Sequence, residues 1–240
     1  MNVYERKTIS ERVCGNPYVG RGIVVGSTED GEKAVAAYFI MGRSDNSRNR
    51  VFVEKEGGLF TAPFDASKVK DPSLIIYAAM RPLFDKLIVT NGDQTDTVYN
   101  ALQAGKTFEE ALRTRSFEPD KPHLTPRISA LLELGKEDFR YKMSILKSAD
   151  ENGTACDRFF FEYERLKGVG HFIHTYVTDG DPLPTFVGEP ERVVIPSDVK
   201  AFADELWNAL DENNKISLYV RSIRLKDGKE ENYLFNKNAR

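Results

Sequence analysis

The order of the predicted elements along the chain indicates an α+β domain built in layers. Strands come first, helices follow in the middle, a long β-rich stretch comes next, and a helix and a hairpin come last. Helices and strands that are segregated in this way favour antiparallel sheets covered by helices over an alternating parallel sheet. The 240 residues, 40% of them hydrophobic, suffice for a sizeable core. We therefore expect a single domain over residues 1–240.

Composition and charge argue against several classes of protein. The net charge of −3 is unlike that of a nucleic-acid-binding surface, so an anion site would need a local cluster of Arg or Lys. The two cysteines, Cys14 and Cys156, are too few for a disulfide framework, and the three histidines lack metal-ligand spacing. Neither a signal peptide nor an apolar stretch of membrane-spanning length is recognisable. We expect a soluble, cytoplasmic protein without a metal site.

The first quarter of the chain predicts three strands. Residues 1–19 are polar and have the character of an N-terminal extension. Apolar runs at 20–26 and 34–41, and another that starts at Val51, are typical of strands. The polar loop between the second and third strands carries three arginines, namely Arg43, Arg48 and Arg50.

A helix is predicted from Asp71-Pro72 to about Arg81. Asp is a favourable cap and Pro is favourable at the first helical position, whereas Pro82 would end the helix. Tyr77 and Arg81 are four residues apart, so a helix would place them on one face.

The stretch Asn91–Thr97 follows the apolar run 87–90 and precedes a helix predicted at about 97–104. We expect Asn-Gly to form a turn, with Asp96 or Thr95 capping the helix. A strand that ends at a helix N-terminus gathers polar groups and amide donors, which suits an anion or a polarised carbonyl. A capped turn without function is the alternative.

The second half of the chain is mainly β-rich. Thr107 opens a short helix through a capping box, and Ser197 is the expected cap of an amphipathic helix over about 197–212. The remaining pattern predicts strands at 127–134, 140–147, 156–165 and 168–177 and a hairpin over about 216–235.

Polar clusters at the ends of these elements offer guanidinium groups, a phenol and carboxylates. No nucleophile has an obvious neighbouring base. Guanidinium groups favour phosphate, so the clusters predict a phosphate-bearing small molecule as the ligand. The clusters are Gly20-Arg21, the loop 43–50, Tyr77 with Arg81, 91–97, Glu118 and 125–127.

In this order the clusters resemble the archaeal-type inosine monophosphate (IMP) cyclohydrolase family. The resemblance spans about residues 18–177, and its most specific elements are Asn91-Gly92-x-x-Thr95-Asp96-Thr97 and Thr125-Pro126-Arg127-Ile128. It implies a four-layer αββα sandwich, similar to N-terminal nucleophile hydrolases but without the processed nucleophile. It also implies ring closure of 5-formamidoimidazole-4-carboxamide ribotide to IMP. The sequence departs from the family pattern in a longer 43–50 loop, an insertion between residues 118 and 125, and Phe117 in place of Tyr.

The resemblance also implies roles for individual residues. Tyr77 would donate to the formyl oxygen with its pKa lowered by Arg81, Glu118 would accept a proton or orient the carboxamide nitrogen, and Asn91 and Arg127 would bind the carboxamide or base edge. Arg21, Arg43, Arg48 and Arg50 are the candidates for the monophosphate, and Asp96 for a ribose hydroxyl. Thr97 would shape the helix start. Further candidate substrate-binding residues are Ser44, Asn49, Thr125 and Tyr176.

The ribotide would be the partner, no cofactor is expected, and a homo-oligomer is possible. Two other functions stay open. Cys14, if freed at a new N-terminus, would make the chain an N-terminal nucleophile amide hydrolase. Alternatively, the chain is a non-catalytic relative that binds a purine nucleotide.

Overall fold

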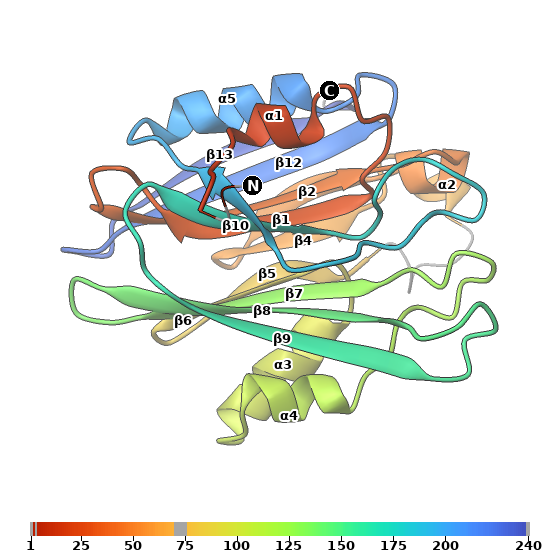
Figure 1. Cartoon of the computed structure of the whole chain (residues 1–240), viewed down its shortest axis with the longest axis horizontal. Coiled ribbons are helices and arrows are strands. Elements are labelled where there is room, and N and C mark those ends of the chain that lie inside the picture. Colours follow the sequence, from red (N-terminus) through yellow and green to blue (C-terminus); the bar gives the residue numbers. More distant parts are fainter. Residues whose placement is uncertain (1, 3, 70–75, 239–240) are drawn as a thin grey trace.

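Two antiparallel sheets lie face to face in the computed structural model, which describes residues 2, 4–69 and 76–238 (Figure 1). One sheet has the strand order β11 (Glu191–Val194), β10 (Val169–His174), β1 (Arg21–Ser27), β2 (Lys33–Met41), β12 (Lys215–Arg224) and β13 (Glu230–Asn236). The other has the order β3 (Val51–Lys55), β4 (Gly58–Ala62), β5 (Ala78–Leu83), β6 (Lys86–Thr90), β7 (Arg127–Leu134), β8 (Phe139–Ser148) and β9 (Cys156–Glu164).

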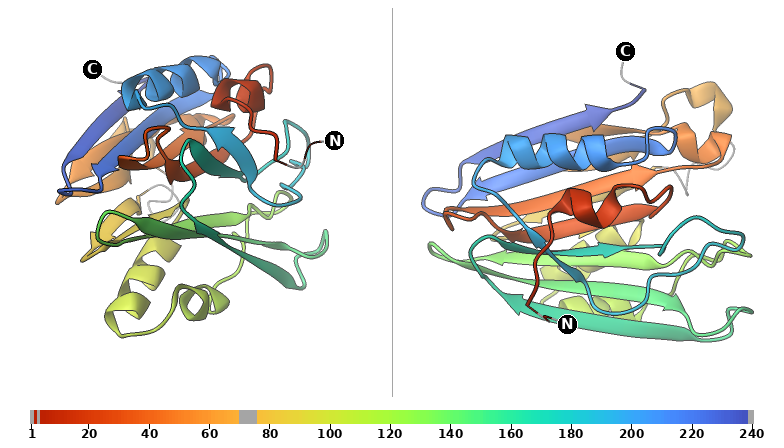
Figure 2. Two further views of the ribbon diagram at one scale, coloured as in Figure 1. Left: turned by 60° about the vertical axis from the view of Figure 1, so that its left-hand side comes forward. Right: turned by 45° about the horizontal axis from the view of Figure 1, so that its top comes forward.

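Helices cover the outer face of each sheet (Figures 1 and 2). The β1-containing sheet is covered by α1 (Ile9–Val13) and α5 (Val199–Ala209), and the β7-containing sheet by α3 (Gln94–Gln103) and α4 (Phe108–Arg113). A short helix, α2 (Asp45–Arg48), and a 3-10 turn, Ala66–Lys68, lie in connections. The α+β class is therefore confirmed. Within the described part of the chain, every helix is too short or too polar to cross a membrane.

The two sheets bury side chains on both faces, which explains their long apolar runs. In β2, Ala36, Tyr38 and Ile40 belong to the core between the sheets. Val35, Ala37 and Phe39 alternate with them and pack under α1 and α5. Because strand side chains alternate between faces, a strand in the middle of such a stack must be apolar throughout.

The helix predicted up to Arg81 is wrong over residues 78–81, because β5 occupies them. Met80, Arg81 and Pro82 pair with Val89, Ile88 and Leu87 of β6. Pro82 is tolerated because pairing with β4 has already ended at Met80, so its missing N–H leaves no gap in a ladder. Strand pairing overrides the helix preference of Ala-Ala-Met. The start predicted at Asp71-Pro72 lies outside the described residues.

The cap predicted for the central helix is also wrong. Helix α3 starts three residues earlier than expected, at Gln94, and its N-cap residue is Asp93. The hydroxyl of Thr95 is hydrogen bonded to the hydroxyl of Thr90 at 2.6 Å, and Asp96 lies in the first turn. The last helix starts at Val199 with Asp198, rather than Ser197, as its cap.

Part of the polar N-terminal stretch is built into the fold. Thr8 forms a capping box with Glu11 at the start of α1. Ile9 and Val13 are buried against α5, and Tyr18 and Val19 belong to the same cluster.

A buried histidine between the sheets should make the fold sensitive to acid. Tyr141 Oη and His171 Nδ1 are 2.7 Å apart, and the His171 ring stacks on Tyr163 at 3.6 Å between centroids. Burial, helped by the charge of Arg192, lowers the pKa of His171 from 6.5 to about 4. Its neutral form is thus stabilising above pH 6.5, and that contribution is lost as the pH falls towards 4.

We expect about 3 kcal/mol of unfolding free energy to disappear over this range through His171 alone. Urea unfolding between pH 7 and pH 4 measures the loss. His171→Gln, which does not titrate, should flatten the dependence. An unchanged slope in His171→Gln would refute this assignment.

Candidate active site

A hollow of about 230 Å³ lies at the end of the molecule where β1 begins and the 43–50 and 118–125 loops meet. Its lining brings together seven of the candidate residues, Arg21, Arg43, Ser44, Arg50, Glu118, Thr125 and Tyr176. They are joined by Tyr18, Asn46, Ser47, Asp120, His123 and Leu183, which the sequence did not single out.

Arg21 and Arg50 bring two cations to this hollow. Among the described residues, neither guanidinium makes a hydrogen bond or ion pair, and both Nε atoms are buried without a partner. Arg50 is only 6% exposed. Burial lowers the pKa of Arg50, and the charge of Arg21 lowers it further. For Arg21, burial is outweighed by Glu118 and the surrounding phenols, so its pKa is raised. A buried cation normally has a partner, so the pair is suited to an anion.

Glu118 is held at this site by its backbone, whose N–H donates to the carbonyl of Thr125 at 2.9 Å. Its carboxylate lies near Gly92, where a Cβ would come within 3.6 Å of Oε1. Burial raises the pKa of Glu118 above its usual 4.5, although the charges of Arg21 and Arg127 oppose the shift. A carboxylate with a raised pKa beside two cations is a suitable proton acceptor.

Two phenols lie next to these charges. The hydroxyl groups of Tyr77 and Tyr38 are 2.8 Å apart, and Tyr38 is fully buried in β2. The Tyr77 backbone is fixed by Thr61, whose Oγ1 accepts from the Tyr77 N–H at 3.0 Å. Burial, with Tyr77 as a neighbour, raises the pKa of Tyr38. Both phenols act on the charge of Arg50, so the pair lies close to the two cations, although neither phenol lines the hollow.

A hydrogen-bonded chain forms another wall. Thr125 Oγ1 donates to the Asp120 carboxylate, and it therefore accepts from the Tyr176 hydroxyl at 2.5 Å. The Tyr176 ring stacks on Tyr18, over which Arg43 lies at 5.2 Å from the ring centroid. Thr125 and Tyr176 are thus held rigidly.

Five candidates are not brought to the hollow. Arg48 is bonded to the Gly42 carbonyl and Asn214, and Asn49 to the backbone of Asp65. Arg81 pairs with Asp96 at 2.7 Å and stacks on Tyr99, on the helix side of its sheet. The premise that Tyr77 and Arg81 share a helix face is therefore wrong. Thr97, within α3, is the fifth.

Asn91 and Arg127 lie beside the hollow but are engaged by the protein. The Asn91 amide donates to the Pro126 carbonyl at 2.9 Å, and its oxygen accepts from Gln94 at 2.8 Å and from the Ile128 N–H at 2.9 Å. Arg127 donates to Gln94 and pairs with Asp93, both at 2.7 Å. These bonds tie the end of β6 to the start of β7, which places Arg127 near Glu118.

Asn91→Ala should therefore act mainly on stability. Losing the amide leaves the Pro126 carbonyl and the Ile128 N–H unpaired inside the protein, so we expect a loss of about 3 kcal/mol. Urea unfolding measures it, with the exposed Asn100→Ala as the matched control. A variant of native stability with a raised KM would show direct contact with substrate instead.

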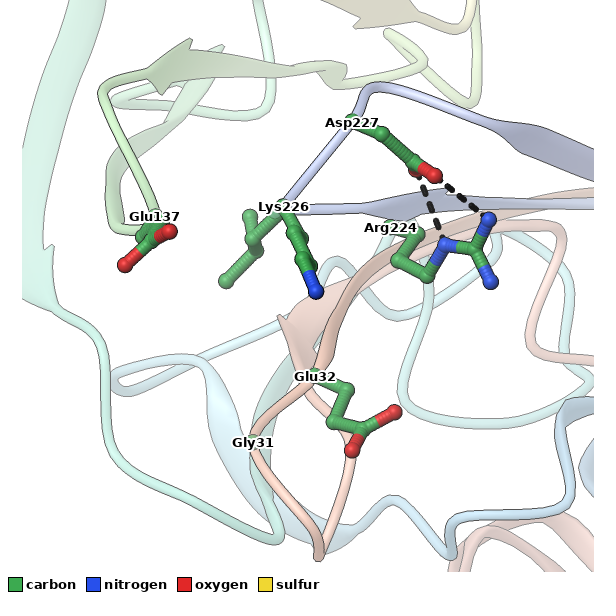
Figure 3. A pocket seen from close by; sticks show the side chains of 7 residues that line it. Gly31, Glu32, Glu137, Arg224, Lys226 and Asp227 are labelled. Carbon is green, nitrogen blue, oxygen red and sulfur yellow. Dashed lines mark hydrogen bonds and ion pairs between the residues drawn. The ribbon is translucent and has the colours of Figure 1, made fainter.

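Cys14 is exposed at the end of α1 and does not line the hollow. A larger hollow of about 630 Å³ lies elsewhere, between the turns around Gly31, Glu137 and Asp227 (Figure 3). Its labelled side chains come from turns and, for Arg224, from the end of β12, and Arg224 is already paired with Asp227. It thus lacks the unpaired buried cations of the smaller site.

Comparison with known proteins relates most of the chain to one family. Residues 18–229 match a family described as "IMP cyclohydrolase-like protein". A Methanopyrus kandleri protein named IMP cyclohydrolase is 36% identical over 119 residues, which are 48% of this chain and 59% of that protein. A protein of the same name from Methanocaldococcus jannaschii is 29% identical over 140 residues, or 54% and 68% of the two chains. The first alignment thus spans less than two thirds of the relative.

Proposed function

Because the chain belongs to the IMP cyclohydrolase-like protein family, we propose that it closes the pyrimidine ring of IMP from 5-formamidoimidazole-4-carboxamide ribotide. The observation that carries the proposal is the pair of cations Arg21 and Arg50, which make no ion pair among the described residues and lie beside Glu118 and the Tyr38–Tyr77 pair. This set combines an anion site and a proton acceptor in the hollow with a pair of phenols beside it.

For this reaction the protein must mainly position the two reacting groups and stabilise the charge that develops on the formyl oxygen. The carboxamide nitrogen attacks the formyl carbon, a C–N bond forms, and the formyl oxygen becomes an alkoxide. That oxygen then leaves as water, with one proton from the carboxamide nitrogen and one from the formamido nitrogen. Both reacting groups belong to one molecule, so the site must hold the formamido group turned towards the carboxamide.

Each role has a candidate in the hollow or beside it. Tyr77 donates to the developing oxyanion, and Tyr38 supports it through the 2.8 Å hydroxyl contact. Glu118 accepts the proton of the carboxamide nitrogen. Arg21, Arg43 and Arg50 hold the monophosphate and the negative charge of the intermediate, and Ser44, Thr125 and Tyr176 complete the walls.

The same proposal extends to the fold type. Two antiparallel sheets between helical layers support an αββα sandwich similar to N-terminal nucleophile hydrolases. The exposed position of Cys14 supports chemistry without a processed nucleophile.

The direct test is to supply the formamido ribotide and follow IMP formation by ultraviolet absorbance. We expect ring closure well above the uncatalysed rate. The corresponding nucleoside, which lacks the phosphate, is the matched substrate and should show a strongly raised KM. Tight binding of IMP without any ring closure would replace the proposal with the non-catalytic function.

A further inference from the structure

The edge strand β9 carries a self-complementary pattern that is unrelated to the hollow. It is the last strand of its sheet, next to β8, and Figure 2 shows it along the border of that sheet. Among the described residues, the backbone from Arg158 to Glu164 makes hydrogen bonds only to β8. An edge of nine residues, with neither Pro nor Gly, offers unpaired N–H and C=O groups to another strand.

The side chains of β9 differ between its two faces. Phe159, Phe161 and Tyr163 pair with Ile145, Met143 and Tyr141 of β8, so they lie on the face between the sheets. Phe159 is nevertheless 42% exposed. Arg158, Phe160 and Glu162 point to the face covered by α3 and α4, where Phe160 packs and the two charged side chains are exposed.

Among the described residues, Arg158 makes no ion pair, and Glu162 makes only a long one. Arg158 donates only to backbone carbonyls, of Cys156 and Arg115, and Glu162 is 3.9 Å from Lys142. Along β9, Arg158 lies two residues before Phe160 and Glu162 lies two residues after it. An antiparallel two-fold pairing centred on Phe160 would therefore place Arg158 of one chain opposite Glu162 of the other, twice. It would also place Phe159 opposite Phe161 on the other face.

We infer that β9 is an interface between two copies of this chain, which join their β7-containing sheets into one across a two-fold axis. The occupant is a second copy because the pattern is complementary to itself, as an isologous interface requires. The pattern also fixes the register. A shift of the axis to Phe161 would set Phe160 against Glu162, and a shift by half a residue would set one chain's helix-covered face against the inner face of the other.

Charge-reversal variants test whether the dimer forms through β9 rather than through another surface. Sedimentation equilibrium of the full chain should show a dimer, and Glu162→Arg should shift it to the monomer because Arg158 and residue 162 then repel across the axis. Arg158→Glu should do the same. The double variant with both changes restores opposite charges and should recover the dimer. Lys55→Glu, on the edge strand β3 at the other end of the same sheet, is the control and should keep the dimer.

Circular dichroism and thermal unfolding of each variant show that a monomer is folded. Glu162→Arg is the cleaner single variant, because Arg158 also bonds the Arg115 carbonyl. A monomeric wild type throughout the micromolar range overturns the inference. So does an assembly that survives both single changes, or a double variant that stays monomeric while folded. Because none of these variants alters the hollow, failure here leaves the proposed ring closure untouched.

Discussion

Glu118→Gln is expected to lower kcat for ring closure by about 100-fold or more, since it removes the proton acceptor while keeping size and shape. The wild-type kcat/KM should also rise with pH through the pKa of Glu118. Burial raises that pKa above its usual 4.5, so the rise should lie at higher pH than for an ordinary carboxyl group. The variant should lack this limb of the profile. Steady-state kinetics from pH 4 to pH 8 measure both effects.

Asp120→Asn is the matched control for Glu118. Asp120 lines the same hollow, but its two oxygens are taken by the Thr125 backbone N–H and hydroxyl. Its change should affect KM more than kcat. The acid limb should persist but move to lower pH, because the charge of Asp120 contributes to the raised pKa of Glu118. If Glu118→Gln retained both kcat and the pH profile, the proton acceptor would have to be another group.

Tyr77→Phe is expected to lower kcat by at least about tenfold, because the oxyanion loses a positioned donor. KM should change little, since the ring remains and the cations still hold the substrate. Tyr38→Phe is the matched variant. It keeps the Tyr77 hydroxyl but removes the partner 2.8 Å away, so its effect on kcat should be smaller.

Native thermal stability of both tyrosine variants would show that the kinetic effect is local. Equal loss in the two variants would mean that the hydroxyl pair acts as one unit. Unchanged kcat in Tyr77→Phe would remove Tyr77 from the chemistry.

Most strands could be predicted from the sequence because their apolar runs are long and end at clear turns. Strand β7 has the predicted bounds, and the capping box at Thr107 is confirmed. The predicted helix was wrong at residues 78–81 because Ala, Met and Arg favour helices locally, while the neighbouring β6 decides the conformation of β5. The sequence of β5 alone does not indicate that it will pair with β6.

The site was predictable only where a residue type itself suggests chemistry. Arg21, Arg50 and Glu118 were found because charged groups at the ends of elements and in the loops between them are conspicuous, and the hollow does contain them. Tyr38 could not be found, since it alternates with apolar residues in a buried strand and only the Tyr77 contact distinguishes it. Asn91 is the opposite case, because its sequence context was conspicuous but its side chain serves the fold. Its Asn-Gly context suggests exposure, but the structure uses its amide internally.

The unpaired guanidinium groups of Arg21 and Arg50 also imply a trade-off between stability and activity. Burial and the neighbouring charge of Arg21 both disfavour the Arg50 cation, so the fold is less stable than its packing alone would allow. Any anion that neutralises them binds the folded chain selectively and shifts the folding equilibrium towards it. The cellular pool of phosphorylated metabolites would then act as a stabilising solute for this protein, and its resistance to heat and proteolysis would follow the supply of its own substrate.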